Sequence, residues 1–361
     1  MSNRLLTLAR RSSPQRRALA PRPTRFRLRT ADAGGPIAYA DFGGEGPPIV
    51  LIHGLGGCHL NWLPAAPMLA RHGRVLAIDL VGFGRTPRAG RSHGLEGQRA
   101  MLERFLDEVV REPAVILGNS LGGLIALMHA ARRPDQVRAL GLISPALPPS
   151  NGAKPRLANL ARYMVQATPG LGELAMFLDG RRVGARGLFM ELLTLGTKDV
   201  TAVPPEVVEA NVSLIADRMK KSPFRHAQSY LDATRSMAAH LLVPGLVDRW
   251  ARAVRSPVLV LHGAHDRIVP PAWSARLAEQ HGFEREEMES AGHVPQMEDA
   301  PRFVEHVTGW LRRHAILAEK AAPSLRVVPS ERAPSTIREA APRSVRPGFA
   351  ANDEAPASRA A

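Results

Sequence analysis

The chain is poor in cysteine and in long apolar runs. Cys58 is the only cysteine among 361 residues, so no disulfide can form within the chain and a reducing compartment is favoured. The sequence also lacks the Cys/His spacing of a zinc site, so no metal is expected. No run reaches the roughly 18 consecutive apolar residues of a membrane span, and no apolar core of a secretion signal lies near the N-terminus. We therefore expect a cytoplasmic protein without a membrane span, with organelle targeting by the arginine-rich N-terminus left open.

Positive charge is concentrated at the N-terminus. The net charge of +15 would by itself suggest binding to nucleic acid. Nine arginines and no acidic residue lie in residues 1–30, and residues 315–361 contribute +2, which leaves +4 for residues 31–314. Because the body is nearly neutral, we expect no nucleic-acid partner. We predict a disordered basic arm over residues 1–24 and a disordered tail rich in Ala, Pro and Arg over residues 315–361.

Between these ends, short aliphatic runs alternate with helix-length amphipathic segments. This alternation is typical of the α/β class, with a mostly parallel sheet flanked by helices on both faces. The composition, 45% hydrophobic, is sufficient for a sizeable core. The core is predicted to comprise residues 25–145 and 256–314. Eight strands are expected, over residues 25–29, 37–42, 49–53, 75–79, 114–118, 139–144, 258–262 and 285–289.

The alternation is interrupted once, by residues 146–255, between the sixth and seventh expected strands. This segment has the pattern of several short helices separated by prolines and glycines. A structureless loop of that length is improbable inside a compact domain. We therefore predict a helical lid inserted between strands 6 and 7.

Ser120 lies in a strand, turn and helix pattern. The strand expected over residues 114–118 leads into Gly118-Asn119-Ser120-Leu121-Gly122-Gly123, and an apolar helix follows. This is the G-x-S-x-G pattern of a nucleophile elbow, in which the turn lifts the serine hydroxyl above the sheet. Glycines at the flanking positions remove side chains that would collide in such a turn. Ser120 is therefore predicted to be a catalytic nucleophile.

A serine hydroxyl needs a general base, and the base needs an orienting carboxylate. Among the 13 histidines, His293 lies in the loop between the last expected strand and the final helix. Asp266 directly follows the strand expected over residues 258–262, although it could instead cap the helix that begins near Pro270. Asp248 and His265 are interpreted as surface groups. The predicted catalytic triad is Ser120, Asp266 and His293.

Acyl transfer also needs hydrogen-bond donors for the oxyanion. The strand expected over residues 49–53 runs into His53-Gly54-Leu55-Gly56-Gly57, a loop that can turn its amides toward Ser120. We assign the oxyanion hole to the backbone N–H groups of Leu55 and Leu121. His53 is interpreted as a structural histidine that hydrogen-bonds this loop. Residues 79–86 form a shaping loop, because they lack the Lys-Ser/Thr ending of a phosphate-binding loop.

Together these motifs resemble the α/β-hydrolase superfamily, from about residue 25 to residue 313. The matching patterns are H-G-x-G at 53–56, D-x-x-G-x-G-x-S/T at 79–86, G-x-S-x-G at 118–122, G-x-x-D-x-x-V-P at 263–270 and G-H-x-P at 292–295. The order of nucleophile, acid and base is also the order of that family. The resemblance implies a serine hydrolase, but it leaves the reaction open.

The leading hypothesis for the reaction is hydrolysis of a carboxylic ester or thioester through an acyl-enzyme. Family members that open epoxides or remove halogen attack with an aspartate, so Ser120 disfavours both reactions. Cleavage of a C–C bond in a ring-fission product is the alternative, because the elbow and Trp62 are similar to those enzymes. Gly57 and Val294, however, stand where those enzymes usually have proline and tryptophan. The alternative from another class is a receptor for a small molecule with little turnover.

Five residues are expected to contact a small-molecule substrate. They lie in or near the oxyanion loop, in the elbow, in the lid and after the catalytic histidine: Gly54, Trp62, Asn119, Met176 and Val294. Apolar lid segments such as the one around Met176 are expected to pack the lid on the sheet, and the alternative role for them is a pocket for an apolar acyl group. No cofactor is expected, because the triad and the backbone amides suffice for the chemistry. No oligomeric state is predicted.

Overall fold

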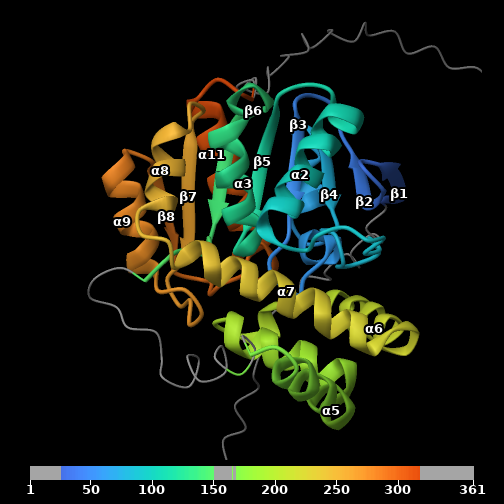
Figure 1. Ribbon diagram of the computed structural model, residues 1–361. Helices are drawn as coiled ribbons and strands as arrows, with labels where there is room; N and C mark the ends of the chain where they lie inside the picture. The colour runs from blue at the N-terminus through green and yellow to red at the C-terminus, as the bar shows by residue number, and fades with distance from the viewer. Residues whose placement is uncertain (1–25, 150–164, 166–167, 318–361) are drawn as a thin grey trace, which may run out of the picture. The chain divides into compact units, whose positions relative to one another are not determined.

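The computed structural model of the protein describes residues 26–149, 165 and 168–317 (Figure 1). The chain divides into two units, residues 1–319 and 320–361, and the second lies wholly outside the described residues. The predicted basic arm, residues 1–24, lies outside them as well, as does the predicted tail beyond residue 317.

An eight-stranded sheet forms the centre of the described chain. Its strands are β1 (Arg27–Asp32), β2 (Pro36–Gly43), β3 (Pro48–Ile52), β4 (Arg74–Ile78), β5 (Ala114–Asn119), β6 (Val137–Ile143), β7 (Val258–Gly263) and β8 (Glu284–Met288). Their order is β1-β2-β4-β3-β5-β6-β7-β8. The pairings of β1 with β2 and of β2 with β4 are antiparallel, and all other pairings are parallel. The predicted mostly parallel sheet of eight strands is confirmed.

The central strands are apolar on both faces because both faces are covered. In β3, Val50 and Ile52 belong to one core cluster, whereas Ile49 and Leu51 belong to the other. Successive side chains of a strand point to opposite faces, so a continuous aliphatic run supplies two cores at once. This explains why the buried strands have no alternation of apolar and polar residues.

Helices cover both faces of the sheet. The first core cluster joins one face to α2 (Leu95–Phe105), α3 (Leu121–Arg132), α8 (Leu246–Ala253) and α9 (Pro271–His281). The second joins the opposite face to α1 (Ala66–Leu69) and α11 (Ala300–Arg313). Figure 1 shows α2 and α3 in front of the sheet and α11 behind it. The short elements are η1 (His59–Trp62), η2 (Leu106–Val110), η3 (Pro134–Gln136) and α10 (Pro295–Glu298).

A helical insertion follows β6, as predicted. It contains α5 (Leu171–Gly196), which is kinked at Gly184, η4 (Val200–Ala202), α6 (Pro205–Lys221) and α7 (Pro223–Leu241). Figure 1 shows α5, α6 and α7 grouped at one end of the sheet, and the guanidinium of Arg218 on α6 donates to the loop after β4 there. The predicted lid range also includes α8, but α8 packs on α3 over the sheet. The lid proper therefore consists of α5, α6 and α7.

None of the helices in the described chain combines the length and the apolar character that crossing a membrane requires.

Candidate active site

Ser120 occupies a strained turn between β5 and α3. Its backbone angles are φ 55° and ψ −116°, a region that residues other than glycine rarely adopt. Such a conformation costs roughly 1 to 3 kcal/mol, so its surroundings must enforce it. They do so through backbone hydrogen bonds, because the Ser120 amide donates to the Ile143 carbonyl at 3.0 Å and the Ser120 carbonyl accepts from the Ala146 amide at 3.1 Å.

The glycines of the elbow are required by close contacts between backbones. A Cβ atom at Gly118 would lie 2.4 Å from the carbonyl oxygen of Gly122. A Cβ atom at Gly122 would lie 2.4 Å from the carbonyl oxygen of Ile52 at the end of β3. The pattern G-x-S-x-G thus lets the start of α3 approach both β5 and the loop after β3. This approach brings the nucleophile elbow next to the predicted oxyanion loop.

His293 and Asp266 form a buried pair. The Nδ1 atom of His293 lies 2.7 Å from Oδ2 of Asp266, which leaves the Nε2 atom of His293 for a reaction partner. The other oxygen of Asp266 accepts the amides of Ile268 at 2.8 Å and Val269 at 2.9 Å. Asp266 therefore does more than cap the helix that follows it.

The protonation state of Asp266 follows from its neighbours. Burial alone would raise the pKa of this carboxyl group. The charge of His293 and the hydrogen bonds from His262 and His293 outweigh burial and hold the pKa of Asp266 well below its usual range. The carboxylate is thus ionised at neutral pH, as a residue that orients an imidazolium must be.

Asn119 joins the serine loop to the histidine loop. Its buried side-chain amide donates to the carbonyl oxygens of His293 at 3.0 Å and Ile143 at 3.1 Å. Within the described chain the Ser120 hydroxyl makes no hydrogen bond, so the predicted transfer of its proton to His293 requires the two side chains to approach when substrate binds. Hydrogen bonds of this kind are often long before substrate is bound. The structure brings the loops of Ser120, Asp266 and His293 together at one end of the sheet.

The two amides predicted to form the oxyanion hole are available. Among the described residues, the N–H groups of Leu55 and Leu121 have no hydrogen-bond partner. Leu121 is the first residue of α3, where a backbone N–H has no acceptor within the helix. At Gly54 a Cβ atom would lie 3.1 Å from Cβ of Ser120, so this loop passes directly beside the nucleophile.

His53 holds the oxyanion loop as a neutral imidazole. Its Nδ1 atom donates to the Gly54 carbonyl at 2.7 Å, and its Nε2 atom accepts the Leu80 amide at 3.1 Å. Burial lowers the pKa of His53 to about 4. The loop after β3 is thereby fixed to the loop after β4, which agrees with the structural role expected for this histidine.

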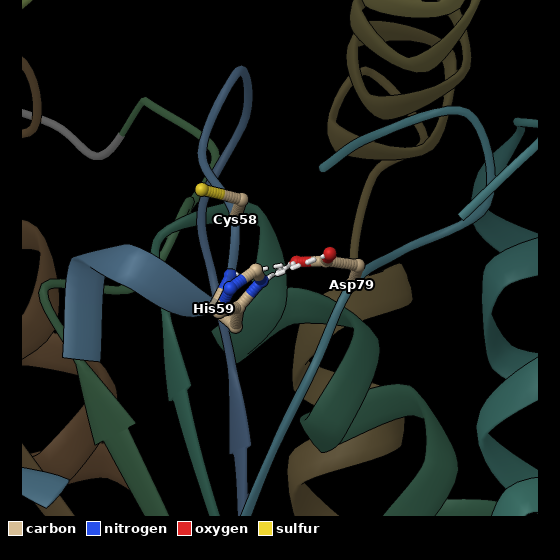
Figure 2. A group of neighbouring side chains, drawn as sticks. All are labelled: Cys58, His59 and Asp79. Atoms are coloured by element: carbon tan, nitrogen blue, oxygen red, sulfur yellow. Dashed lines mark hydrogen bonds and ion pairs between the residues drawn. The ribbon is translucent and has the colours of Figure 1, made fainter. Parts of the chain in front are cut away.

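Asp79 fixes the same region from the end of β4. Its carboxylate accepts the His59 amide at 2.7 Å, the His59 Nδ1 at 3.0 Å and the Arg85 amide at 2.8 Å. Figure 2 shows the sulfur of Cys58 pointing away from this pair, and the sulfur contacts Asn211 at 3.4 Å. The Cys58 sulfur, a ring nitrogen of His59 and a carboxylate oxygen of Asp79 lie within 4.8 Å of one another, as the ligands of a metal ion would. Burial raises the pKa of the Cys58 thiol, which disfavours the thiolate that a metal requires, so the hydrogen bonds between His59 and Asp79 serve to shape the loop.

Two of the expected substrate contacts have other partners in the structure. Trp62 has no exposed surface and packs against Phe303 of α11 in the second core cluster. The structure does not bring Trp62 to Ser120, because η1 directs the indole into the core beside α11. Asn119 uses its amide hydrogens on two carbonyl groups, as described above. Both side chains therefore support the site from within the core.

The other expected contacts lie in the lid or beside the histidine. Val294 is partly buried and packs against the cluster that holds Phe189 of α5. Met176 lines a cavity of about 350 Å³ within the lid. The cavity has a mostly apolar lining, made by Met176, Phe177, Gly180, Arg181, Leu188, Met219 and Ala227.

Two buried residues near the triad escaped the sequence reasoning. The Nε2 atom of His262, in β7, lies 2.9 Å from the same carboxylate oxygen of Asp266 that His293 contacts. Glu298, in α10, accepts the Gly292 amide at 2.9 Å and the Lys198 amide at 2.7 Å. A polar residue inside an aliphatic strand is the one signal that could have revealed His262. Nothing in the sequence around Glu298 indicates its partners.

Comparisons with known proteins identify the family of this chain. A family profile described as alpha/beta hydrolase fold matches residues 47–300. The chain is 31% identical over 290 residues to 2-hydroxy-6-oxo-2,4-heptadienoate hydrolase of Pseudomonas putida, covering 77% of this chain and 94% of that protein. It is also 31% identical over 261 residues to pimeloyl-[acyl-carrier protein] methyl ester esterase of Neisseria meningitidis, covering 71% of this chain and 90% of the relative.

Solved structures show the same fold. Haloalkane dehalogenase DbeA from Bradyrhizobium elkani superposes with a TM-score of 0.66 at 22% identity, covering 80% of this chain and 98% of that chain. At this level of identity the likeness concerns the fold alone. The chain belongs to the α/β-hydrolase family. Since its relatives include a C–C bond hydrolase and an ester hydrolase, family membership leaves the bond that is cleaved undecided.

Proposed function

We propose that the protein is a serine hydrolase that cleaves a carboxylic ester or thioester through an acyl-enzyme. The observation that carries this proposal is the strained Ser120 at the elbow, joined through Asn119 to the loop of a His293–Asp266 pair. A strained backbone at a half-buried serine needs a compensating use, and nucleophilic attack is that use in this fold.

The proposed reaction has two halves. Oγ of Ser120 attacks the acyl carbonyl and gives its proton to Nε2 of His293, while Asp266 stabilises the imidazolium that forms. The oxyanion accepts hydrogen bonds from the amides of Leu55 and Leu121. The leaving alcohol or thiol takes the proton from His293, and the acyl group remains on Ser120. Water then attacks the acyl-enzyme with His293 again as base, and the carboxylic acid is released.

The lid cavity is the proposed binding site for an apolar acyl group of the substrate. Thioether, phenyl and aliphatic side chains form most of its lining, and Gly180 contributes no side chain to it. A leucine at position 180 would extend toward Met219, which lies 3.1 Å from the position of a Cβ atom there. In Gly180→Leu we expect esters of long acids to lose about tenfold in kcat/KM for every two methylenes displaced, and acetate esters to be unaffected. Equal loss for acetate and octanoate esters would refute the acyl site in the lid.

Labelling with a fluorophosphonate tests the nucleophile. The wild-type chain is expected to be labelled at Ser120 and to turn over p-nitrophenyl esters steadily, whereas Ser120→Ala is expected to do neither. Comparable ester turnover by Ser120→Ala would show that the nucleophile is misassigned. A single stoichiometric burst without steady turnover would favour the receptor that hydrolyses slowly.

Cleavage of a C–C bond in a ring-fission product is the second candidate. The identity of 31% to the heptadienoate hydrolase of Pseudomonas putida favours it. Arg181 lies at the lid cavity and, within the described chain, forms no ion pair, so its guanidinium is available for the carboxylate of such a substrate. Arg182, the other arginine considered for this role, is paired with Asp179 at 3.6 Å.

A substrate panel separates the two candidates. For a C–C hydrolase, a ring-fission dienoate should exceed every ester in kcat/KM, and Arg181→Gln should reduce the dienoate rate selectively. For an esterase, the dienoate should be inert and Arg181→Gln should leave ester hydrolysis within about twofold of the wild type.

A further inference from the structure

His262 is the second imidazole on the catalytic carboxylate. Its side chain is completely buried near the end of β7. The Nε2 atom lies 2.9 Å from Oδ2 of Asp266 and 3.1 Å from the carbonyl oxygen of Val269. The Nδ1 atom lies 2.7 Å from Oγ of Ser274, which lies 2.9 Å from the Pro271 carbonyl. Every polar atom of this ring therefore has a partner.

These contacts fix the position of one proton. Both neighbours of the His262 Nε2 atom, a carboxylate and a carbonyl oxygen, can only accept, so Nε2 must donate. Ser274 can either donate to Nδ1 or accept from it and donate to Pro271. In both arrangements the hydrogen bond from His262 to Asp266 is the same. Oδ2 of Asp266 thus accepts two imidazole N–H groups, one from His262 and one from His293.

We propose that His262 is a positioning residue that sets the charge available to the catalytic histidine. This inference rests on the proposed serine hydrolase function. His262 shares the negative charge of Oδ2, so that less of it acts on the imidazolium of His293 than in a triad with a single hydrogen bond to the acid. It also gives Oδ2 a second hydrogen bond that holds it in place, while two amides hold Oδ1.

The acidic limb of the pH–rate profile reports this sharing. Without the donor at position 262, more charge remains on Oδ2, and His293 keeps its proton to higher pH. The other ionisable groups packed around the pair are Glu298 in α10, Lys198 after α5 and Arg267 beside Asp266. Glu289 contributes only its carbonyl, to the ammonium of Lys198, and His265 is exposed. These groups stay unchanged in the variants, so a difference between profiles belongs to position 262.

The experiment compares His262→Leu, His262→Gln and Ser274→Ala with the wild type. The readout is the pH dependence of kcat/KM for p-nitrophenyl butyrate and of the rate constant for fluorophosphonate labelling, which does not depend on the folded fraction. Leucine removes the donor, and its acidic limb is expected about one pH unit higher. Glutamine can place an N–H near the position of Nε2, and Ser274→Ala leaves Nε2 in place, so both profiles are expected within about 0.3 pH units of the wild type.

The outcomes are distinct. If the leucine profile coincides with that of the wild type, or if the glutamine profile moves as far as the leucine profile, the proposed role of His262 is wrong. If His262→Leu does not accumulate as folded protein, His262→Asn, whose shorter amide does not reach the Nε2 position, takes its place with the same expected shift. An absence of labelling and turnover in the wild type would instead refute the proposed function itself.

Discussion

Replacing Asp266 by asparagine separates charge and tautomer from shape. The amides of Ile268 and Val269 require an acceptor, so the asparagine carbonyl must occupy the position of Oδ1. Its NH₂ group then takes the position of Oδ2, facing Nδ1 of His293 and Nε2 of His262. A donor there forces His293 to carry its proton on Nε2, the atom that has to accept the proton of Ser120.

The fold should tolerate this change better than the reaction does. His262 can move its proton to Nδ1 and donate to Ser274, which can pass its own hydrogen to the Pro271 carbonyl. The two hydrogens of the new amide then serve two imidazole acceptors. His293 has no such relief, because the proton on Nε2 blocks its function as a base.

The expected loss in kcat is about ten-thousand-fold, the size measured when a triad aspartate becomes asparagine, which corresponds to about 5.4 kcal/mol of transition-state stabilisation. The assay is steady-state hydrolysis of p-nitrophenyl butyrate, with thermal unfolding to verify the fold. Asp248→Asn is the matched control, because Asp248 bonds His281 at 3.1 Å between α8 and α9 and should leave activity unchanged. A folded Asp266→Asn protein that keeps more than a tenth of the wild-type kcat would refute the assignment of the acid.

Three further predictions concern the loops around the nucleophile. In Gly122→Ala the new methyl group meets the Ile52 carbonyl, so the free energy of unfolding should fall by about 1 to 3 kcal/mol, measured by denaturant titration, and an unchanged value would contradict the close approach. Asn119→Ala removes the hydrogen-bond donor of the His293 carbonyl and one of the two donors of the Ile143 carbonyl. We expect kcat for esters to fall more than tenfold with little change in KM, whereas a change in KM alone would return Asn119 to substrate binding. The pKa of His53 is about 4 in the folded chain and 6.5 as the ordinary value, so the unfolded chain takes up this proton first as the pH falls. The free energy of unfolding should therefore drop by up to about 3 kcal/mol between pH 6.5 and 4. His53→Gln, which lacks this titrating group, should show a smaller drop.

The local sequence pattern was sufficient to predict the strands and the helical insertion. Short runs of strand length, most of them aliphatic, predicted all eight strands within three residues of their observed ends. The predicted helical insertion follows β6 as expected. These features depend on residues close together in the chain, where side-chain period and turn chemistry act directly. The glycine spacing around Ser120 is of the same kind, because the collisions that it avoids occur within one turn and the strand beside it.

Contacts between distant segments had to come from the tertiary structure. Trp62 follows the oxyanion loop in sequence, yet it packs under α11, because the direction of η1 depends on the bonds between His59 and Asp79. The hydrogen bond from Asn119 to the His293 carbonyl joins residues 174 positions apart.

The two histidines that contact one oxygen of Asp266 show the same difference between what the sequence determines and what the tertiary structure decides. The sequence by itself determined which residue types stand at the strand ends, because a buried parallel sheet restricts its strands to aliphatic residues and places polar groups where the strands end. Only the tertiary structure decided which of those polar groups share a proton or a charge, because hydrogen bonding depends on distances that several independent loops set together.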